Sequence, residues 1–177
     1  MNKKIALFIS ILAIVLTVSA ISATASAATS TSINGKGAVA TWHIQNVGSS
    51  NPVTYTDVYA ILSESNSGTD GNLYLMVHGT TIATTPVDFT WNMDHITVSA
   101  MVTIWGITHT IDITWQSLPK SQGIAPGSSN GMTVNLGGSW KAAVATITFD
   151  GTHPGSSGPF DSMSAYIVHG SASIALP

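Results

Sequence analysis

Three residues near the middle of the chain, Ser99, Thr103 and Trp105, could together bind a sugar. They share one parity in a segment of alternating apolar and polar residues, so their side chains should emerge on one face of a β-strand. The flat face of an indole packs against the C–H side of a sugar ring, while nearby hydroxyls bond to the sugar hydroxyls. In the alternative interpretation, Trp105 is covered by a second layer or turned inward by a bulge.

The six histidines of the chain prompt a search for a metal site. Zinc and copper sites need three or four converging ligands, often with two histidines closely spaced on one element, and no such pair occurs here. His109 falls in phase with the apolar side of its segment, which predicts a buried histidine hydrogen-bonded to the backbone. The sequence therefore predicts no metal and no cofactor.

Two further patterns resemble catalytic motifs. Residues 127–131 match the Gly-x-Ser-x-Gly pattern around Ser129, but that motif works where a strand turns sharply into a helix, and these residues lie in a loop-forming segment. Asp94 and His95 are adjacent, and adjacent strand residues point to opposite faces, so a shared acid–base role is not expected. Asp94 is predicted to cap a turn.

Acidic residues give no clear site either. Glu64, Asn66, Asp70 and Asn72 could offer oxygens to Ca²⁺, but their spacing is not that of a helix–loop–helix calcium loop, which favours a solvated loop. The acids are few and scattered, so the sequence shows no two carboxylates that would meet for glycoside hydrolysis. We expect no catalytic residues.

The element that must position the sugar-binding candidates is a hairpin over residues 95–115. In its first half Ile96, Val98, Ala100, Val102 and Ile104 share one parity, and Gly106 interrupts. In its second half Ile107, Ile111, Ile113 and Trp115 alternate with Thr108, Thr110, Asp112 and Thr114. Such a hairpin has one apolar face and one threonine face. We expect the rest of the chain to pack around the apolar face.

Similar alternation recurs along the chain, with no helical period after residue 27. Turn-forming clusters such as 48–52 and 137–138, and long loops at 63–72, 119–131 and 150–161, separate about nine short strands. Both parities are apolar near the end of 53–62, which predicts a central or bulged strand. The predicted fold is all-β: a single antiparallel β-sandwich, with a barrel as the alternative.

The first 27 residues have the pattern of a secretory signal peptide. Lys3 and Lys4 precede an apolar run over 5–16, and the segment ends Ala25-Ser26-Ala27. A membrane anchor is the alternative, but the run is shorter than the roughly 20 residues that a spanning helix needs. We expect cleavage after Ala27, a single domain over 28–177, and no membrane attachment after cleavage.

Composition narrows the partners. The chain has no Cys and no Arg, and residues 28–177 carry three lysines against eight acids, a formal charge of −5. Disulfides are thus absent, and without clustered cations nucleic acid and anionic lipid are not expected partners. The polar surface consists mainly of Thr, Ser, Asn and Gly, which fits an extracellular location; we interpret the threonines mainly as strand formers.

Three motifs carry a resemblance to a known group. They are the 55–59 segment (Tyr-Thr-Asp-Val-Tyr), the 96–104 strand and the 110–115 segment (Thr-Ile-Asp-Ile-Thr-Trp), followed by the 142–146 segment (Ala-Ala-Val-Ala-Thr). In this order they resemble a group of secreted, uncharacterised, β-rich bacterial proteins. The resemblance implies secretion and a β-rich fold, and it implies no known activity and no functional residue.

These observations lead to one functional expectation and two alternatives. We expect a secreted, non-catalytic extracellular protein, either an envelope or matrix component or a small binding module, with a polysaccharide or another cell-surface component as its partner. One alternative is a secreted hydrolase whose site lies on the long loops. The other is a structural protein that self-associates through a weakly protected edge strand.

Overall fold

The computed structural model describes residues 30–45, 55–65, 70–77, 80–104, 106–119, 128–129, 132–151 and 164–175. Within these ranges the chain forms β-strands and no helix, so no described helix could cross a membrane. The strands are β1 (Ser30–Gln45), β2 (Tyr55–Glu64), β3 (Asp70–Val77), β4 (Thr80–Trp91), β5 (His95–Ile104), β6 (Ile107–Ser117), β7 (Ser128–Ser129), β8 (Met132–Phe149) and β9 (Ser164–Ala175).

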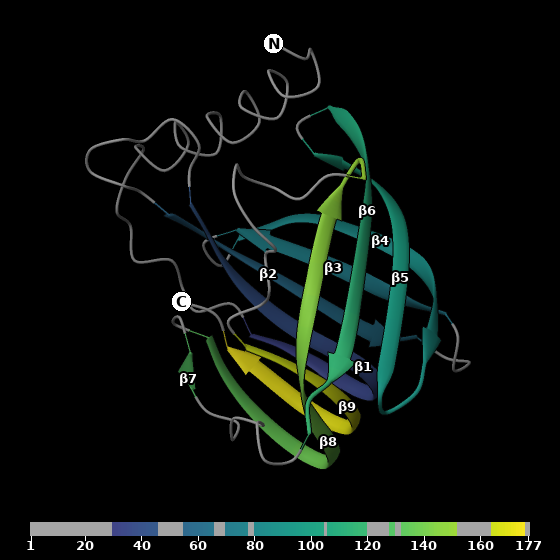
Figure 1. Ribbon diagram of the computed structural model, residues 1–177, viewed down its shortest axis with the longest axis vertical. Helices are drawn as coiled ribbons and strands as arrows, with labels where there is room; N and C mark the ends of the chain where they lie inside the picture. Colours follow the sequence, from purple (N-terminus) through teal and green to yellow (C-terminus); the bar gives the residue numbers. More distant parts are fainter. Residues whose placement is uncertain are drawn as a thin grey trace.

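The strands form one antiparallel sheet in the order β6-β5-β4-β3-β2-β1-β9-β8-β7. Because β6 also pairs with β8, eight of the strands close in a ring (Figure 1). The all-β, antiparallel class predicted from the sequence is confirmed. A single sheet supplies both walls of the core, since strands on opposite sides of the ring face each other.

The interior of the ring is the main apolar core. The alternation predicted for the hairpin is confirmed: Ile96, Ile104 and Ile113 are buried inside, together with Trp42 and Trp115. The indole N–H of Trp42 donates to the carbonyl oxygen of Ala145 at 3.2 Å, and that of Trp115 to the carbonyl oxygen of Val39 at the same distance. These two bonds satisfy the indole nitrogens and tie β1 to β8 and β6 through the interior.

A second apolar cluster lies on the opposite face of the central strands. It contains Tyr59 and Ile61 of β2 together with Val39, Tyr166 and Val168 of the neighbouring strands. Burial raises the pKa of the Tyr166 hydroxyl, and it raises the pKa of Tyr59 to about 12 with a smaller contribution from the nearby Asp57 carboxylate. Of the two interpretations predicted for the apolar pattern of β2, a central strand or a bulged one, the central strand is confirmed.

Three glycines lie opposite one another on β1, β9 and β8. Gly35 pairs with Gly170, and Gly170 pairs with Gly138. Their φ angles are 101°, 141° and 92°, a region that L side chains rarely adopt. A Cβ on Gly170 would lie 2.6 Å from the carbonyl oxygen of Gly137, and one on Gly138 would lie 2.8 Å from that of His169. Glycine is therefore required here for the close approach as well as for the angle.

This glycine row corrects two predicted strand breaks. The sequence indicated separate strands on either side of 137–138 and of 170–171, whereas β8 and β9 each run continuously through these positions. The strands leave the regular pleat at the row without losing their pairing. β1 likewise begins at Ser30, in a segment predicted to be a frayed or edge start, and β8, β9 and β1 lie side by side at the lower end of the sheet (Figure 1).

Pro86 lies inside β4 but is paired on one side only, with Asn72 of β3. In the described pairing, β4 contacts β5 only over Phe89–Trp91, so Pro86 occupies an edge position on the β5 side, where its missing N–H interrupts no ladder. Trp140 lies in β8 and is 37 % exposed beside Tyr166.

Candidate binding face

The structure places the sugar-binding candidates on the outward face of the hairpin. Ser99 and Thr103 are exposed on β5, and each follows a buried valine, Val98 and Val102. Trp105 lies outside the described residues, so its predicted stacking role stays a prediction. Ser99 and Thr103 do not contact each other directly, because Met101 stands between them with 74 % of its surface exposed.

The outward face extends well beyond these two residues. We call it the threonine face; it comprises the outward residues of β4, β5, β6 and β8, namely Thr90, Thr97, Ser99, Met101, Thr103, Thr108, Thr110, Asp112, Thr114, Thr146 and Thr148. Its hydroxyls bond across strands: Thr90 Oγ1 lies 2.5 Å from Thr97 Oγ1, and Thr103 Oγ1 lies 3.1 Å from Thr108 Oγ1. Cross-strand pairs of this kind hold the hydroxyls in place.

Several residues of this face escaped the sequence analysis, most clearly Thr90 and Thr146. Thr97 and Thr114 could have been paired from the hairpin turn at Gly106, because the turn position sets the register. Thr146 could not have been placed beside them, since β8 joins β6 only through the closure of the ring. Thr90 reaches Thr97 across the 92–94 turn between β4 and β5, which the sequence did not identify as a hairpin turn. Strand order is the information that the sequence lacked.

The described lysines are engaged away from the threonine face. Lys36 lies 3.9 Å from the Glu64 carboxylate, and its Nζ lies 5.4 Å from the centre of the Trp91 ring. The Lys141 Nζ donates to Asp94 Oδ1 at 2.5 Å. Among the described residues, the charges on the face itself are therefore carboxylates only, such as Asp112.

Asp94 does not cap the turn as predicted. The cap is the side chain of Asn92, whose Oδ1 accepts hydrogen bonds from the backbone N–H groups of Asp94 at 2.8 Å and His95 at 2.7 Å. Asp94 instead accepts from Lys141 and Ser117, and these two hydrogen bonds, with the positive charge of Lys141, lower its pKa. The expectation that Asp94 and His95 do not act as a pair agrees with these separate partners.

His109 is buried as predicted, but a carboxylate is its partner where a backbone group was expected. Its side chain is 2 % exposed, and its Nδ1 lies 3.0 Å from Asp150 Oδ2. The other carboxylate oxygen of Asp150 accepts the backbone N–H of Thr110 at 2.9 Å. Asp150, in the turn that follows β8, adopts a φ of 50°, which is unusual for a residue other than glycine. The His109 Nε2 is buried with no hydrogen-bond partner among the described residues.

A second histidine–carboxylate pair lies across β1 and β2. His43 and Asp57 are opposite each other in register, with Nδ1 and Oδ1 2.6 Å apart, and both side chains are partly exposed. A carboxylate on Nδ1 is the arrangement that orients a general-base histidine. Neither pair forms a metal site: no three His, Asp or Glu side chains converge anywhere in the described ranges.

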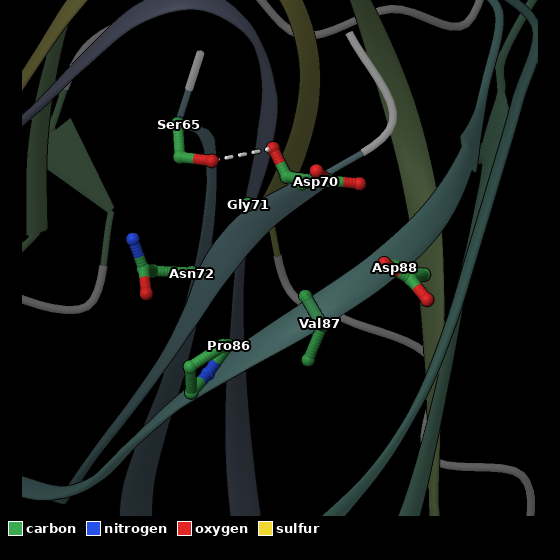
Figure 2. A pocket seen from close by; sticks show the side chains of 7 residues that line it. All are labelled: Ser65, Asp70, Gly71, Asn72, Pro86, Val87 and Asp88. Atoms are coloured by element: carbon green, nitrogen blue, oxygen red, sulfur yellow. Dashed lines mark hydrogen bonds between the residues drawn. The ribbon is translucent and has the colours of Figure 1, made fainter. Parts of the chain in front are cut away.

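An open pocket of about 410 Å³ lies where β3 and β4 adjoin the end of β2 (Figure 2). Asp70 and Asp88 line it, opposite each other in register, with Asn72 and Ser65 beside them. The Ser65 hydroxyl donates to the backbone carbonyl of Asp70 at 3.1 Å. Of the four residues weighed as calcium ligands, Asp70 and Asn72 share this pocket, Glu64 accepts the Lys36 backbone N–H at 2.8 Å, and Asn66 lies outside the described residues.

The Gly-x-Ser-x-Gly match has no catalytic setting in the described part. Ser129 belongs to the two-residue strand β7, where it pairs with Met132 of β8. A nucleophile elbow needs a strand that turns into a helix, and the described residues contain none.

Comparison with known proteins adds no assignment. No protein-family model matches the chain, and no curated protein and no solved structure matches it. The functional argument therefore depends on the geometry of the chain itself.

Proposed function

We propose that the protein is a secreted, non-catalytic binding module of the cell envelope or extracellular matrix, and that the threonine face holds a carbohydrate polymer. The main observation in support is the outward side of β5, where the exposed hydroxyls of Ser99 and Thr103 flank the exposed Met101. Hydroxyls can both donate to and accept from sugar hydroxyls, and the methionine offers an apolar contact for the C–H side of a ring.

The charge of the face supports a carbohydrate partner over a highly charged one. Apart from carboxylates, the described outward residues are neutral, while Lys36 and Lys141 are engaged elsewhere. A binding mode based on sugar hydroxyls needs no charge complementarity, whereas nucleic acids and anionic lipids do. Secretion is the second part of the proposal; it is supported by the pattern of residues 1–27 and by the resemblance of other segments to secreted β-rich proteins.

A pull-down on insoluble polysaccharides tests the binding proposal. The full chain is expressed in a secreting host, and the protein recovered from the medium is mixed with microcrystalline cellulose, chitin or purified cell walls. We expect depletion from the supernatant with at least one polymer, and an N-terminus at Ala28 by mass spectrometry. Retention on none of them would remove carbohydrate binding, and intracellular retention of the uncleaved chain would remove secretion.

A secreted hydrolase is a second candidate, favoured by the His43–Asp57 pair. The 2.6 Å contact between His43 Nδ1 and Asp57 Oδ1 is the arrangement that orients a general-base histidine. Fluorogenic ester and glycoside substrates test it: a hydrolase would turn them over and lose most of that rate in the variant His43→Gln. The matched control is His95→Gln, since His95 Nδ1 pairs with the neutral amide of Gln116 at 3.0 Å and has no carboxylate to orient it.

A further inference from the structure

Four threonines form one straight register row across four neighbouring strands. Thr90 of β4 pairs with Thr97 of β5, Thr97 pairs with Thr114 of β6, and Thr114 pairs with Thr146 of β8. Neighbouring strands are spaced about 4.8 Å apart, so the same β-branched hydroxyl side chain repeats at that interval. We call these four residues the threonine row.

The rows on either side lack this uniformity. Moving along the strands in one direction, the next row contains Ser99, Asp112 and Thr148; in the other direction it contains His95, Gln116 and Val144. Of these three rows, only the threonine row presents the same side chain on every strand. A polymer built from one repeating unit would therefore meet the same group at each step along this row. Its direction is across the strands, because along β5 the hydroxyls are interrupted by Met101.

The hydroxyls of the row are partly organised before any partner arrives. Thr90 Oγ1 and Thr97 Oγ1 are 2.5 Å apart, so one donates to the other. Each hydroxyl has one donor and two acceptor positions, and such a pair therefore keeps further capacity for a sugar hydroxyl. Side chains already held by a cross-strand bond lose less rotamer freedom on binding, which favours affinity.

Charge at the border of the row selects among polymers. Asp112 lies in the adjacent row, and Asp88 lies two residues before Thr90 on β4 with its side chain exposed. No described lysine faces them, because Lys36 and Lys141 contact Glu64 and Asp94. Carboxylates beside a neutral row repel polyanions and leave neutral polymers unaffected.

We propose that the threonine row is the track for an extended, neutral polysaccharide whose chain lies across β4, β5, β6 and β8. This inference rests on the proposed carbohydrate-binding function and adds the row to the hairpin residues Ser99, Thr103 and Trp105 that the sequence predicted.

Three double variants test the track, each with microcrystalline cellulose, chitin and a polygalacturonate gel as probes. The row variant is Thr97→Val with Thr114→Val, the tip variant is Ser99→Ala with Thr103→Val, and the control is Thr81→Val with Thr84→Val, exposed positions at the far end of β4. Valine keeps the β-branch that strands favour and removes only the hydroxyl. Far-UV circular dichroism and thermal melting confirm that each variant is folded.

We expect the row variant to bind the retained neutral polymer at least tenfold more weakly, the tip variant to lose less affinity than the row variant, the control to bind like the natural chain, and polygalacturonate to retain none of them. If the tip variant alone loses binding, or if polygalacturonate binds as well as the neutral polymers, the track is overturned while carbohydrate binding stands. If the natural chain binds none of the three, the proposed function fails together with the track.

Discussion

The β5–β6 hairpin and the central strand β2 follow the same two-residue alternation but use their outward faces differently. On the hairpin, buried Ile111 and Ile113 alternate with the outward Thr110 and Thr114. On β2, the inward Leu62 and the outward Ile61 are both fully buried, in two separate clusters. Where both faces are apolar, packing occupies the outward side, whereas among the described residues the hairpin side of the ring leaves a polar outward face for a partner.

The strongest test of this contrast compares outward positions in the two regions. Ile61→Ala should lower the free energy of unfolding by about 2–5 kcal/mol, because it leaves a cavity in the second cluster. Thr114→Ala should lower it by only about 0.5 kcal/mol, as an accessible position on the hairpin. Urea denaturation followed by tryptophan fluorescence measures both. Equal losses would mean that the outward face of β2 is not a core.

Alkaline pH should lower the free energy of unfolding through the buried tyrosines of the second apolar cluster. The pKa of Tyr59 is about 12 in the folded chain, above the ordinary value of 10.0, mainly because the hydroxyl is buried. A raised folded pKa means that stability is complete below pH 10 and falls as the pH rises from 10 to 12, by about 3 kcal/mol for this group. Tyr166, whose pKa is also raised, acts in the same direction.

Denaturation curves at pH 9 and pH 11.5, with tyrosinate absorbance recorded in parallel, measure this loss. The variant Tyr59→Phe is the control, because it removes the titrating hydroxyl and keeps the ring. It should lose less stability between the two pH values than the natural chain does. A Tyr59 that ionises near pH 10 in the folded state would contradict its burial in the second cluster.

The alternation within single strands could be predicted from the sequence, and on the hairpin it is confirmed for Ile96, Val98, Ala100, Val102, Ile104, Ile111, Ile113 and Trp115, whereas Ile107 beside the turn is only half-buried. The strand ends predicted at Gly138 and Gly170 were wrong, because a glycine considered alone within a strand pattern indicates an interruption of the strand. The two glycines bend strands here only because they pair with each other and with Gly35, and that pairing joins segments more than 30 residues apart.

The candidate face was predictable in part for the same reason. Ser99 and Thr103 are local to one strand, so parity alone placed them correctly on the outward side. The row they adjoin also needs β8, which becomes a neighbour of β6 only through ring closure. His109 was correctly predicted as buried, but Asp150, its partner, lies 41 residues away on the chain, beyond any local pattern.

The glycine row, on the side of the ring that carries the second cluster, allows a test with a smaller expected loss of stability. Gly170 and Gly106 both have positive φ, of 141° and 82°, but a Cβ at Gly106 would meet nothing within 4 Å. Gly106→Ala therefore reports the cost of the backbone angle alone, about 1–2 kcal/mol. Gly170→Ala adds a collision with the carbonyl oxygen of Gly137, which should cost roughly 1–3 kcal/mol more. Equal losses in urea denaturation would show that strand approach at the row is not constrained.

The smallest expected effect on stability concerns the hairpin side. There the contact between Lys141 of β8 and Asp94 joins β8 to the start of β5. The hydrogen bond from Lys141, then that from Ser117, then the charge of Lys141 lower the pKa of this exposed carboxyl. A depressed folded pKa means that its contribution is present above the ordinary carboxyl pKa and is lost as the pH falls through the folded value. Lys141→Met should raise the Asp94 pKa toward the ordinary range, as followed by carboxyl carbon NMR during an acid titration.

Ser117→Ala, which keeps the lysine, should raise the same pKa by a smaller amount, because it removes one hydrogen bond and no charge. In both variants the change in stability should be slight, since solvent screens exposed ion pairs. An Asp94 pKa that is unchanged in Lys141→Met would mean that the pair does not persist in solution. Backbone pairing and the interior core would then hold the hairpin to β8. Its outward face would carry the threonine hydroxyls without the Asp94–Lys141 ion pair beside the start of β5.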